Sequence, residues 1–288
     1  MNGIIIIDKP SGWTSHDVVA KLRGVLKIKR IGHSGTLDPM ATGVLPVFIG
    51  RATRAVEFMV NSEKEYVAGL KLGIATDTQD ITGNVLSVCD TSVATESLSA
   101  VITGFLGVSM QIPPMYSAVR HKGKKLYELA RRGIEVQRPA REITVSVMDI
   151  LDGGGSDYLL RIVCSKGTYI RTICHDIGAA LGCGGVMSSL RRTMAGTFSI
   201  DMAHTLDEIL EAVSSGGTDK IMLPVDSVFM GFPAAILDEK ETQKAKNGMR
   251  CALSGISDGK YRFYSPDKEF LMLGEAIDGE IKMIKGFI

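Results

Sequence analysis

Runs typical of strands and of helices follow one another in an irregular order, and this order limits the folds open to the chain. IIII at 4–7 and VLPVFIG at 44–50 predict buried strands, and KEYVAGLKLGI at 64–74 alternates like a half-buried strand. Two further strands are expected at 142–150 and 157–164, separated by the turn DGGGSD. Because the order is not a regular β-α-β alternation, we expect an α+β fold with a large mixed, mostly antiparallel sheet flanked by helices and loops.

Helices are expected between these strands. Ser15 can cap a helix through VVAKLRGVLK, and both ATRAVEFMV and residues 94–106 have helical spacing. Another helix is expected along GTYIRTICHDIGAAL, and Thr205 with Glu208 forms a capping box for LDEILEAV.

The composition changes between SSGGTDK at 214–220 and GFP at 231–233. Beyond this point one short helical segment, KETQKAKNG, is followed by strand-like runs such as YRFYS, EFLMLGEAI and EIKMIKGF. The pattern predicts two domains: a large one at 1–228 and a small β-rich one at 229–288.

Length, apolar content and cysteines exclude several classes of protein. No run of eighteen apolar residues occurs, and the apolar start IIII soon meets Asp8 and Lys9, so neither a membrane span nor a signal peptide is expected, and we expect a cytoplasmic protein. The five cysteines form an odd number without a C-x-x-C pair, which argues against a disulfide framework and structural zinc. They are interpreted as reduced, mostly buried thiols.

Charge is unevenly distributed although the net charge is only +1. Residues 120–141, here called the basic arm, hold eight Lys or Arg and two Glu, a local excess of +6. Such an excess is typical of a surface that contacts phosphates, and a solvated helix face followed by a strand is the alternative. A second basic cluster lies at 9–30.

The stretch HSGTLDPMATGVL at 33–45 builds a constrained setting around one carboxylate. Pro39 disfavours the α region for Asp38, and Gly35 and Gly43 permit conformations or close approaches that a Cβ would block. A simple Asp-Pro turn would explain part of this pattern. A phosphate loop, a strand-linked G-x-G-x-x-G, an H-E-x-x-H and a G-x-S-x-G elbow are all absent, so nucleotide-driven, nicotinamide-dependent and zinc-dependent enzymes are disfavoured.

Five segments are too rich in special residues for simple scaffolding. In order they are DKPSGWTS, GHSGTLDPMATGVL, KEYVAGLKLGIATDTQDITG, the segment from QIPPMYSAVR into the basic arm, and CSKGTYIRT with SSLRRTMAG. Together they resemble the bacterial tRNA pseudouridine-55 synthases of the TruB family. The resemblance covers about the first 200 residues. It implies a pseudouridine-synthase fold, isomerisation of uridine 55 in the T-loop of tRNA with base flipping, and neither cofactor nor metal. It also implies a monomer without an obligate protein partner. The C-terminal region resembles the family's small RNA-binding PUA domain in position and composition.

The same resemblance implies roles for particular residues. Asp38 would be the essential carboxylate, acting either as nucleophile or as base, Tyr66 would contact the target base near the C5 proton, and Arg171 would pair with the aspartate. The residues expected to bind the substrate are His33, Tyr66, Tyr169, Leu190, Asp80 and Lys9. Those expected to contact the RNA backbone lie on an RNA-binding insertion at about 120–150 and are Lys122, Lys124, Lys125, Arg131 and Arg132.

Two other functions remain open at this point. The chain could act as a tRNA-binding folding helper, in which binding matters more than turnover, or as the guide-RNA-dependent relative within a ribonucleoprotein. The complete set Asp38, Tyr66 and Arg171 favours an enzyme, and the basic arm together with the small C-terminal region favours the stand-alone type.

Overall fold

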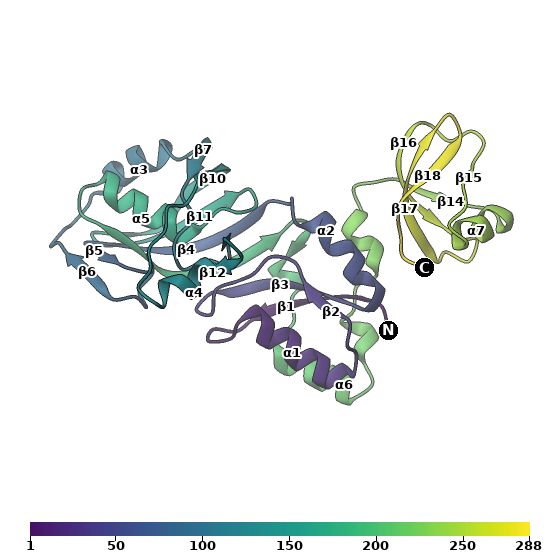
Figure 1. Cartoon of the computed structure of the whole chain (residues 1–288), viewed down its shortest axis with the longest axis horizontal. Coiled ribbons are helices and arrows are strands. Elements are labelled where there is room, and N and C mark those ends of the chain that lie inside the picture. Colours follow the sequence, from purple (N-terminus) through teal and green to yellow (C-terminus); the bar gives the residue numbers. More distant parts are fainter.

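Two sheets dominate the computed structural model, which describes all 288 residues (Figure 1). The larger sheet has nine strands in the order β1-β3-β12-β4-β11-β10-β7, with β2 pairing β3 and β13 pairing β12. Its strands are β1 (Gly3–Lys9), β2 (Ile31–His33), β3 (Thr42–Ile49), β4 (Lys64–Leu72), β7 (Gly107–Gln111), β10 (Arg141–Gly154), β11 (Asp157–Cys164), β12 (Gly185–Ala195) and β13 (Phe198–Ser199). Only β12 and β3 run parallel, so the expected mixed, mostly antiparallel sheet is confirmed.

Short helices and two small hairpins connect these strands. The α-helices of this part are α1 (Ser15–Leu26), α2 (Val56–Met59), α3 (Thr95–Thr103), α4 (Leu126–Ala130), α5 (Ile170–Ala180) and α6 (Leu206–Ser214). The 3-10 turns are η1 (Gly50–Ala55), η2 (Ile200–Met202), η3 (Thr218–Lys220) and η4 (Val225–Phe229), and the hairpins are β5 (Ile74–Thr76) with β6 (Val85–Val88) and β8 (Arg120–His121) with β9 (Lys124–Lys125). None of the helices is long and apolar enough to cross a membrane.

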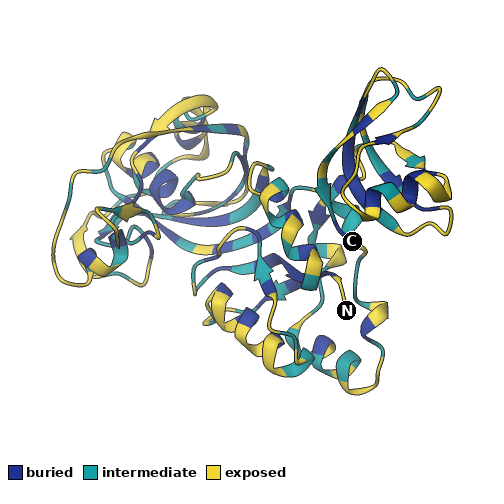
Figure 2. Ribbon diagram, turned by 45° about the vertical axis from the view of Figure 1, so that its right-hand side comes forward, coloured by how far each residue is buried: buried dark blue, intermediate teal, exposed yellow.

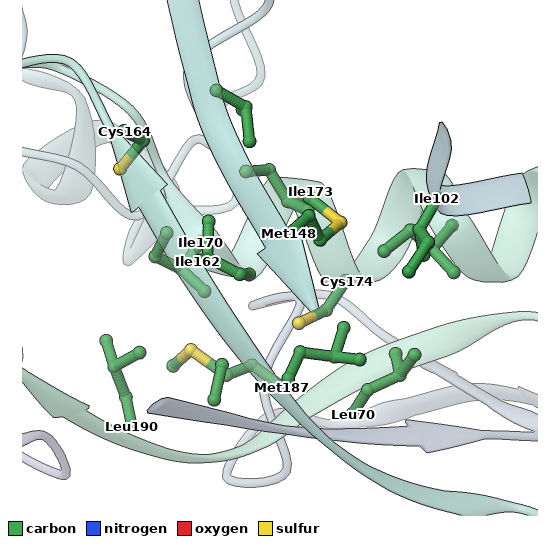
Figure 3. Packing of buried hydrophobic residues seen from close by; sticks show 14 of the residues in the cluster. Leu70, Ile102, Met148, Ile162, Cys164, Ile170, Ile173, Cys174, Met187 and Leu190 are labelled. Carbon is green, nitrogen blue, oxygen red and sulfur yellow. The ribbon is translucent and has the colours of Figure 1, made fainter. Parts of the chain in front are cut away.

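Helices α1 and α5 lie on the same face of the large sheet. Helix α1 covers the half with β1 and β3, and α5 covers the half with β4, β11 and β10. Leu45 and Val47 of β3 pack with α1, whereas Leu190 of β12 packs with α5. Strand β12 joins the halves because it pairs β3 through Arg192 and Gly43 and pairs β4 through Leu190 and Ala68. Figure 3 shows the cluster under α5, where Met187 and Leu190 lie near Ile170, Ile173 and Cys174. The segment between β2 and β3 runs between these two packed halves.

The C-terminal residues form a separate sheet, at the right of Figure 1. Its five strands lie in the order β14-β16-β17-β18-β15, with bounds β14 (Ala234–Ile236), β15 (Cys251–Ala252), β16 (Gly259–Tyr264), β17 (Phe270–Ile277) and β18 (Glu280–Gly286), and α7 (Glu239–Lys246) packs beside them. The expected small β-rich domain is therefore present. Figure 2 shows buried residues along the strands of both sheets, whereas most of the connecting segments are exposed.

Aromatic residues join the small sheet to the large one. Phe229 of η4 lies 5.1 Å from Phe58, 5.6 Å from Phe287 and 6.0 Å from Phe270, measured between ring centroids. These rings belong to one apolar cluster that also contains Ile4 and other residues of β1 and β3. The predicted division at 228/229 therefore falls inside a shared core.

Local expectations differ from the structure in two places, whereas the expectation of reduced, mostly buried cysteines is confirmed. Thr14 caps α1 in place of Ser15, with a capping box to Asp17, because the Ser15 hydroxyl bonds the loop that carries Asp38. ATRAVEFMV is not one helix: it is divided between the 3-10 turn η1 and the single turn α2. All five cysteines are free thiols, three of them buried, and Cys89 is exposed.

Candidate active site

Asp38 lies on the loop between β2 and β3, and this loop is fastened on both sides. The backbone N–H of Leu37 donates to the Ser15 hydroxyl at 2.9 Å, and Gly12 N–H donates to the carbonyl of Pro39 at 2.8 Å. Leu37 and Ala41 are buried in the cluster under α5. The constrained loop predicted from the sequence is thus a bridge between the two halves of the sheet, and it leaves the Asp38 carboxylate partly exposed between them.

Arg171, in the first turn of α5, connects Asp38 to two other segments. Its side chain is 6% exposed, and Nε lies 2.9 Å from Asp38 Oδ2. Nη1 donates to the carbonyl of Thr78 at 3.1 Å and lies 3.6 Å from Asp80 Oδ2, while Nη2 donates to the carbonyl of Tyr116 at 2.8 Å. The planar guanidinium therefore fixes the orientation of the carboxylate, as bidentate and forked donors do.

Asp80, expected to bind the substrate, stabilises a turn and faces Arg171. Its Oδ1 accepts hydrogen bonds from the Thr78 hydroxyl at 2.9 Å and from the N–H and hydroxyl of Thr82 at 3.0 and 2.6 Å, as in a side-chain-stabilised turn. Its Oδ2 faces Arg171. The turn at 77–83 thus presents one carboxylate oxygen to the guanidinium.

Tyr66 and Leu190 lie on the same face of the sheet as this ion pair. Tyr66 pairs across the strands with Arg192, and Leu190 pairs with Ala68, so their side chains point to one side. Burial raises the pKa of the Tyr66 hydroxyl, whereas the positive charge of Arg192 acts in the opposite direction and Asp38 adds to the rise. The phenol is therefore protonated at neutral pH, close enough to Asp38 to sense its charge.

His33 ends β2 beside the same loop. Burial, with smaller contributions from His16 and Arg192, lowers the pKa of His33 to about 4, so the imidazole is neutral. Its Nδ1 is buried without a hydrogen-bond partner, and the rings of His33 and His16 meet edge to face at 5.5 Å. A neutral ring suits contact with an uncharged nucleobase.

Tyr169 occupies the N-cap position of α5, two residues before Arg171. The Gln111 side chain of β7 holds its backbone by accepting from the N–H at 2.8 Å and donating to the carbonyl at 3.0 Å. The start of α5, and with it Arg171, is therefore fixed to the edge of the large sheet.

Lys9 does not fit the direct substrate contact expected for it. The side chain is fully buried, and Nζ donates to the carbonyls of Pro10 at 2.8 Å, Trp13 at 2.7 Å and Pro39 at 3.2 Å. Desolvation lowers the pKa of Lys9 to about 8, while the nearby Asp38 acts against this shift. All three N–H donors of the ammonium are used, and the bond to Pro39 stabilises the loop that carries Asp38.

The basic arm consists of the β8–β9 hairpin, helix α4 and an extended segment to 140. Lys122, Lys124, Arg131 and Arg132 are exposed, and Lys125 is partly buried. The Lys125 ammonium and the Arg131 guanidinium each lie 5.4 Å from the centre of the Tyr127 ring. The segment that leads into the arm contacts the site, because the backbone carbonyl of Tyr116 accepts a hydrogen bond from Arg171.

Two residues near the site were not identified from the sequence. Gln111 begins the segment QIPPMYSAVR, but no role was assigned to it. Arg192 was visible within LRRT, and the alternation of a strand would have separated it from Arg191, whose guanidinium pairs with Asp8 at 2.7 Å on the opposite face.

Comparison with solved structures identifies the class. The chain superposes with a TM-score of 0.75 on a protein in the structure of an H/ACA RNP bound to a substrate RNA containing 2′-deoxyuridine, at 26% identity over 99% of this chain and 85% of that one. A Cbf5-Nop10-Gar1 complex gives the same TM-score at 29% identity, with the same coverage. Together with the curated relatives and family models described next, this fold makes the chain a pseudouridine synthase, an isomerase.

Sequence comparison gives the family. The model of the TruB family pseudouridylate synthase N-terminal domain matches residues 23–170, and that of the tRNA pseudouridylate synthase B C-terminal domain matches 171–230. tRNA pseudouridine synthase B of Clostridium kluyveri is 41% identical over the whole of both chains, and that of Geobacillus thermodenitrificans is 39% identical over the whole of both. The chain belongs to the TruB family. The matched regions end before the five-stranded sheet.

Proposed function

We propose that the protein converts uridine 55 of tRNA to pseudouridine in the T-loop, with the uridine flipped out of the stacked RNA. The observation that carries this proposal is the 2.9 Å contact between the Asp38 carboxylate and the buried Arg171. Access of a carboxylate to C1′ of a nucleotide requires the base to leave its stack, so base flipping follows from the site of reaction. Curated relatives named tRNA pseudouridine synthase B support tRNA as the substrate.

The reaction breaks the bond between N1 and C1′, turns the uracil and rejoins it through C5. Charge that develops on the sugar is stabilised by an adjacent anion, as at the anomeric carbon in glycosidases. Asp38 supplies that anion as nucleophile or as base, and Arg171 keeps it oriented. Tyr66 lies on the same sheet face and contacts the base near the proton that leaves C5, while Leu190, Tyr169 and His33 line its other sides.

The basic arm and the site are joined through Tyr116, which supports RNA binding next to the chemistry. The arm's exposed Lys122, Lys124, Arg131 and Arg132 contact phosphates, and recognition of the folded T-loop depends on shape and splayed bases more than on a duplex code. The match to the TruB models and to full-length relatives favours a stand-alone enzyme over a guide-dependent subunit. It acts as a monomer in the cytoplasm, without cofactor, metal or obligate protein partner.

The decisive experiment incubates the pure protein with an unmodified tRNA transcript and maps pseudouridine along it. We expect one product, at position 55. Asp38→Asn should lose at least about a hundredfold in single-turnover rate, about 2.7 kcal/mol of transition-state stabilisation, with tRNA affinity nearly unchanged. The control is Asp157→Asn, since Asp157 also pairs with a cation, Lys71 at 3.0 Å, outside the site. Product at another position, or an active Asp38→Asn, contradicts the proposal.

A further inference from the structure

Arg192 is a buried cation without an anionic partner. Its side chain is among the largest in the protein that are fully buried, with an exposed fraction of 1%, and it forms no ion pair. Lys9, Lys64 and His33 also feel its charge, which lowers the pKa of each. Burial of an unpaired charge among other cationic or basic groups is costly, so packing alone does not account for this residue.

The donors of Arg192 are directed to the loop that carries Asp38. Nε donates to the carbonyl of Val44 at 2.7 Å, directly after the loop, and Nη2 donates to the carbonyl of Gly35 at 3.1 Å, near its start. Nη1 would lie 3.3 Å from a Cβ placed on Gly35. One guanidinium thus ties both ends of the loop to β12.

The same guanidinium lies beside Tyr66. The two residues are directly paired between β12 and β4, and the positive charge of Arg192 lowers the pKa of the Tyr66 hydroxyl, against the effect of burial. The other charged or titratable groups that act on this hydroxyl are Cys164 of β11 and Asp38 of the loop. Arg192 is therefore the cationic group between two residues assigned to the reaction.

We propose that Arg192 is a positioning residue of the active site, whose buried guanidinium holds the Asp38 loop and the Tyr66 hydroxyl in a single fixed arrangement. This inference rests on the proposed function, because Asp38 and Tyr66 are the groups it positions. Arg171 orients the Asp38 carboxylate from α5, and Arg192 holds the backbone of the same loop from β12.

The chain provides a matched control on the adjacent residue. Arg191 lies on the opposite face, is partly exposed and pairs with Asp8. We would compare Arg192→Lys and Arg192→Met with Arg191→Lys and Arg191→Met, measuring the single-turnover rate at saturating tRNA and the tRNA concentration that gives half of it. Lysine retains the charge but cannot supply the fork of donors that reaches the carbonyls of both Val44 and Gly35.

We expect Arg192→Lys to lower the saturating rate about tenfold or more while the half-saturating concentration stays within about threefold, because misplaced reacting groups slow chemistry more than binding. Arg192→Met should lower the rate further. The Arg191 variants should stay within about threefold of the wild type in both quantities, as expected of a partly exposed ion pair. Thermal unfolding and circular dichroism verify that each variant is folded.

A second measurement separates positioning from simple stability. The absorbance of tyrosinate as a function of pH, taken as the difference between each protein and its Tyr66→Phe counterpart, reports Tyr66 alone. Removal of the cation in Arg192→Met should move this titration to higher pH, since the positive charge favours the phenolate. Arg191→Met should leave it in place. If Arg192→Met does not fold, the saturating rate of Arg192→Lys alone tests the positioning role.

Folded Arg192 variants with the saturating rate and the Tyr66 titration of the wild type would overturn the inference. A wild-type protein that forms no pseudouridine would instead overturn the proposed function. The two failures are therefore distinguishable in one set of measurements.

Discussion

Two glycines on either side of Asp38 contact the same arginine. A Cβ on Gly43, whose φ is +99°, would lie 2.2 Å from the backbone oxygen of Arg192, and a Cβ on Gly35, at φ +75°, would approach the Arg192 side chain. The sequence predicted conformations or close approaches that a Cβ would block, and the structure shows a positive φ at both glycines and a backbone approach at Gly43 that excludes a Cβ. The close approach of β3 to β12 at this point brings the loop next to Tyr66.

Replacement of Gly43 tests this close approach. Gly43→Ala should lower the free energy of unfolding by about 3 kcal/mol or more, because backbone strain and a clash with another backbone act together. Gly216→Ala is the control, since Gly216 has φ +75° and open space around its Cβ position, and should cost only about 1 kcal/mol. Thermal or urea unfolding gives both values, and equal losses would show that the contact with β12 contributes nothing.

The neutral His33 predicts a pH dependence of stability. Its pKa in the folded protein, about 4, lies below the ordinary value of 6.5, so between these values the unfolded chain binds a proton that the folded chain does not. Stability should therefore fall as pH decreases from 6.5 toward 4 and should be independent of His33 above 6.5. His33→Gln should flatten this part of the urea-unfolding profile, whereas His121→Gln, in the basic arm, should not. Parallel profiles for wild type and His33→Gln would contradict the assignment.

At the scale of elements, the sequence predicted the strands that pair within a buried face and missed those defined by their neighbours. β1, β3, β4 and β11 carry apolar runs or alternation and are confirmed. β12 reads GVMSSLRRTMA, without a clear pattern, and becomes a strand because it pairs with β4 and β3. Arg192 was missed for the same reason.

The site residues also divide into those that the sequence indicated and those that depend on neighbours in the fold. The contact of Asp38 with Arg171 was expected from the resemblance and is present. The carbonyls of Thr78 and Tyr116 that complete the surroundings of Arg171 could not be predicted, because backbone acceptors leave no mark on the sequence. Lys9 was assigned to the substrate because its burial depends on the tertiary fold.

The basic arm makes a prediction of its own. Replacement of Lys124, Lys125, Arg131 and Arg132 by alanine should weaken tRNA binding and reduce its salt dependence, by about 0.7 to 0.9 in the slope of log K against log salt for each lost phosphate contact. Alanine at four exposed lysines of the small sheet, Lys240, Lys260, Lys268 and Lys282, is the control and should change the slope less. The measurement is the tRNA affinity of each variant from low to moderate salt. An unchanged slope in the arm variant would show that the arm is a solvated surface that does not contact phosphates.

At the scale of the whole molecule, the small sheet is held by apolar and ionic contacts and has no net charge. Residues 231–288 hold nine basic and nine acidic residues. Lys285 pairs with Glu57 at 2.6 Å, and Arg54 donates to the carbonyl of Gly286 at 3.0 Å. A neutral module contributes shape more than long-range attraction to RNA binding.

Truncation separates these contributions. A chain that ends after Phe232 retains Phe229 over the first strands, and we expect it to need several-fold more tRNA for half-maximal rate while its saturating single-turnover rate stays close to that of the wild type. A chain that ends after Ser227 also loses Phe229 and should unfold at a lower temperature, because the shared apolar cluster is opened. A saturating rate reduced about a hundredfold in the folded longer fragment would place the small sheet in the active site.

Strand β12 also sets the order in which the protein can mature during synthesis. It enters the sheet between β3 and β4, which precede it by more than a hundred residues, and it supplies the arginine that fastens the Asp38 loop. A nascent chain that has not yet released residues 185–195 from the ribosome holds Asp38 and Tyr66 on two unjoined halves. We therefore expect the growing chain to stay inactive until about two thirds of it has emerged.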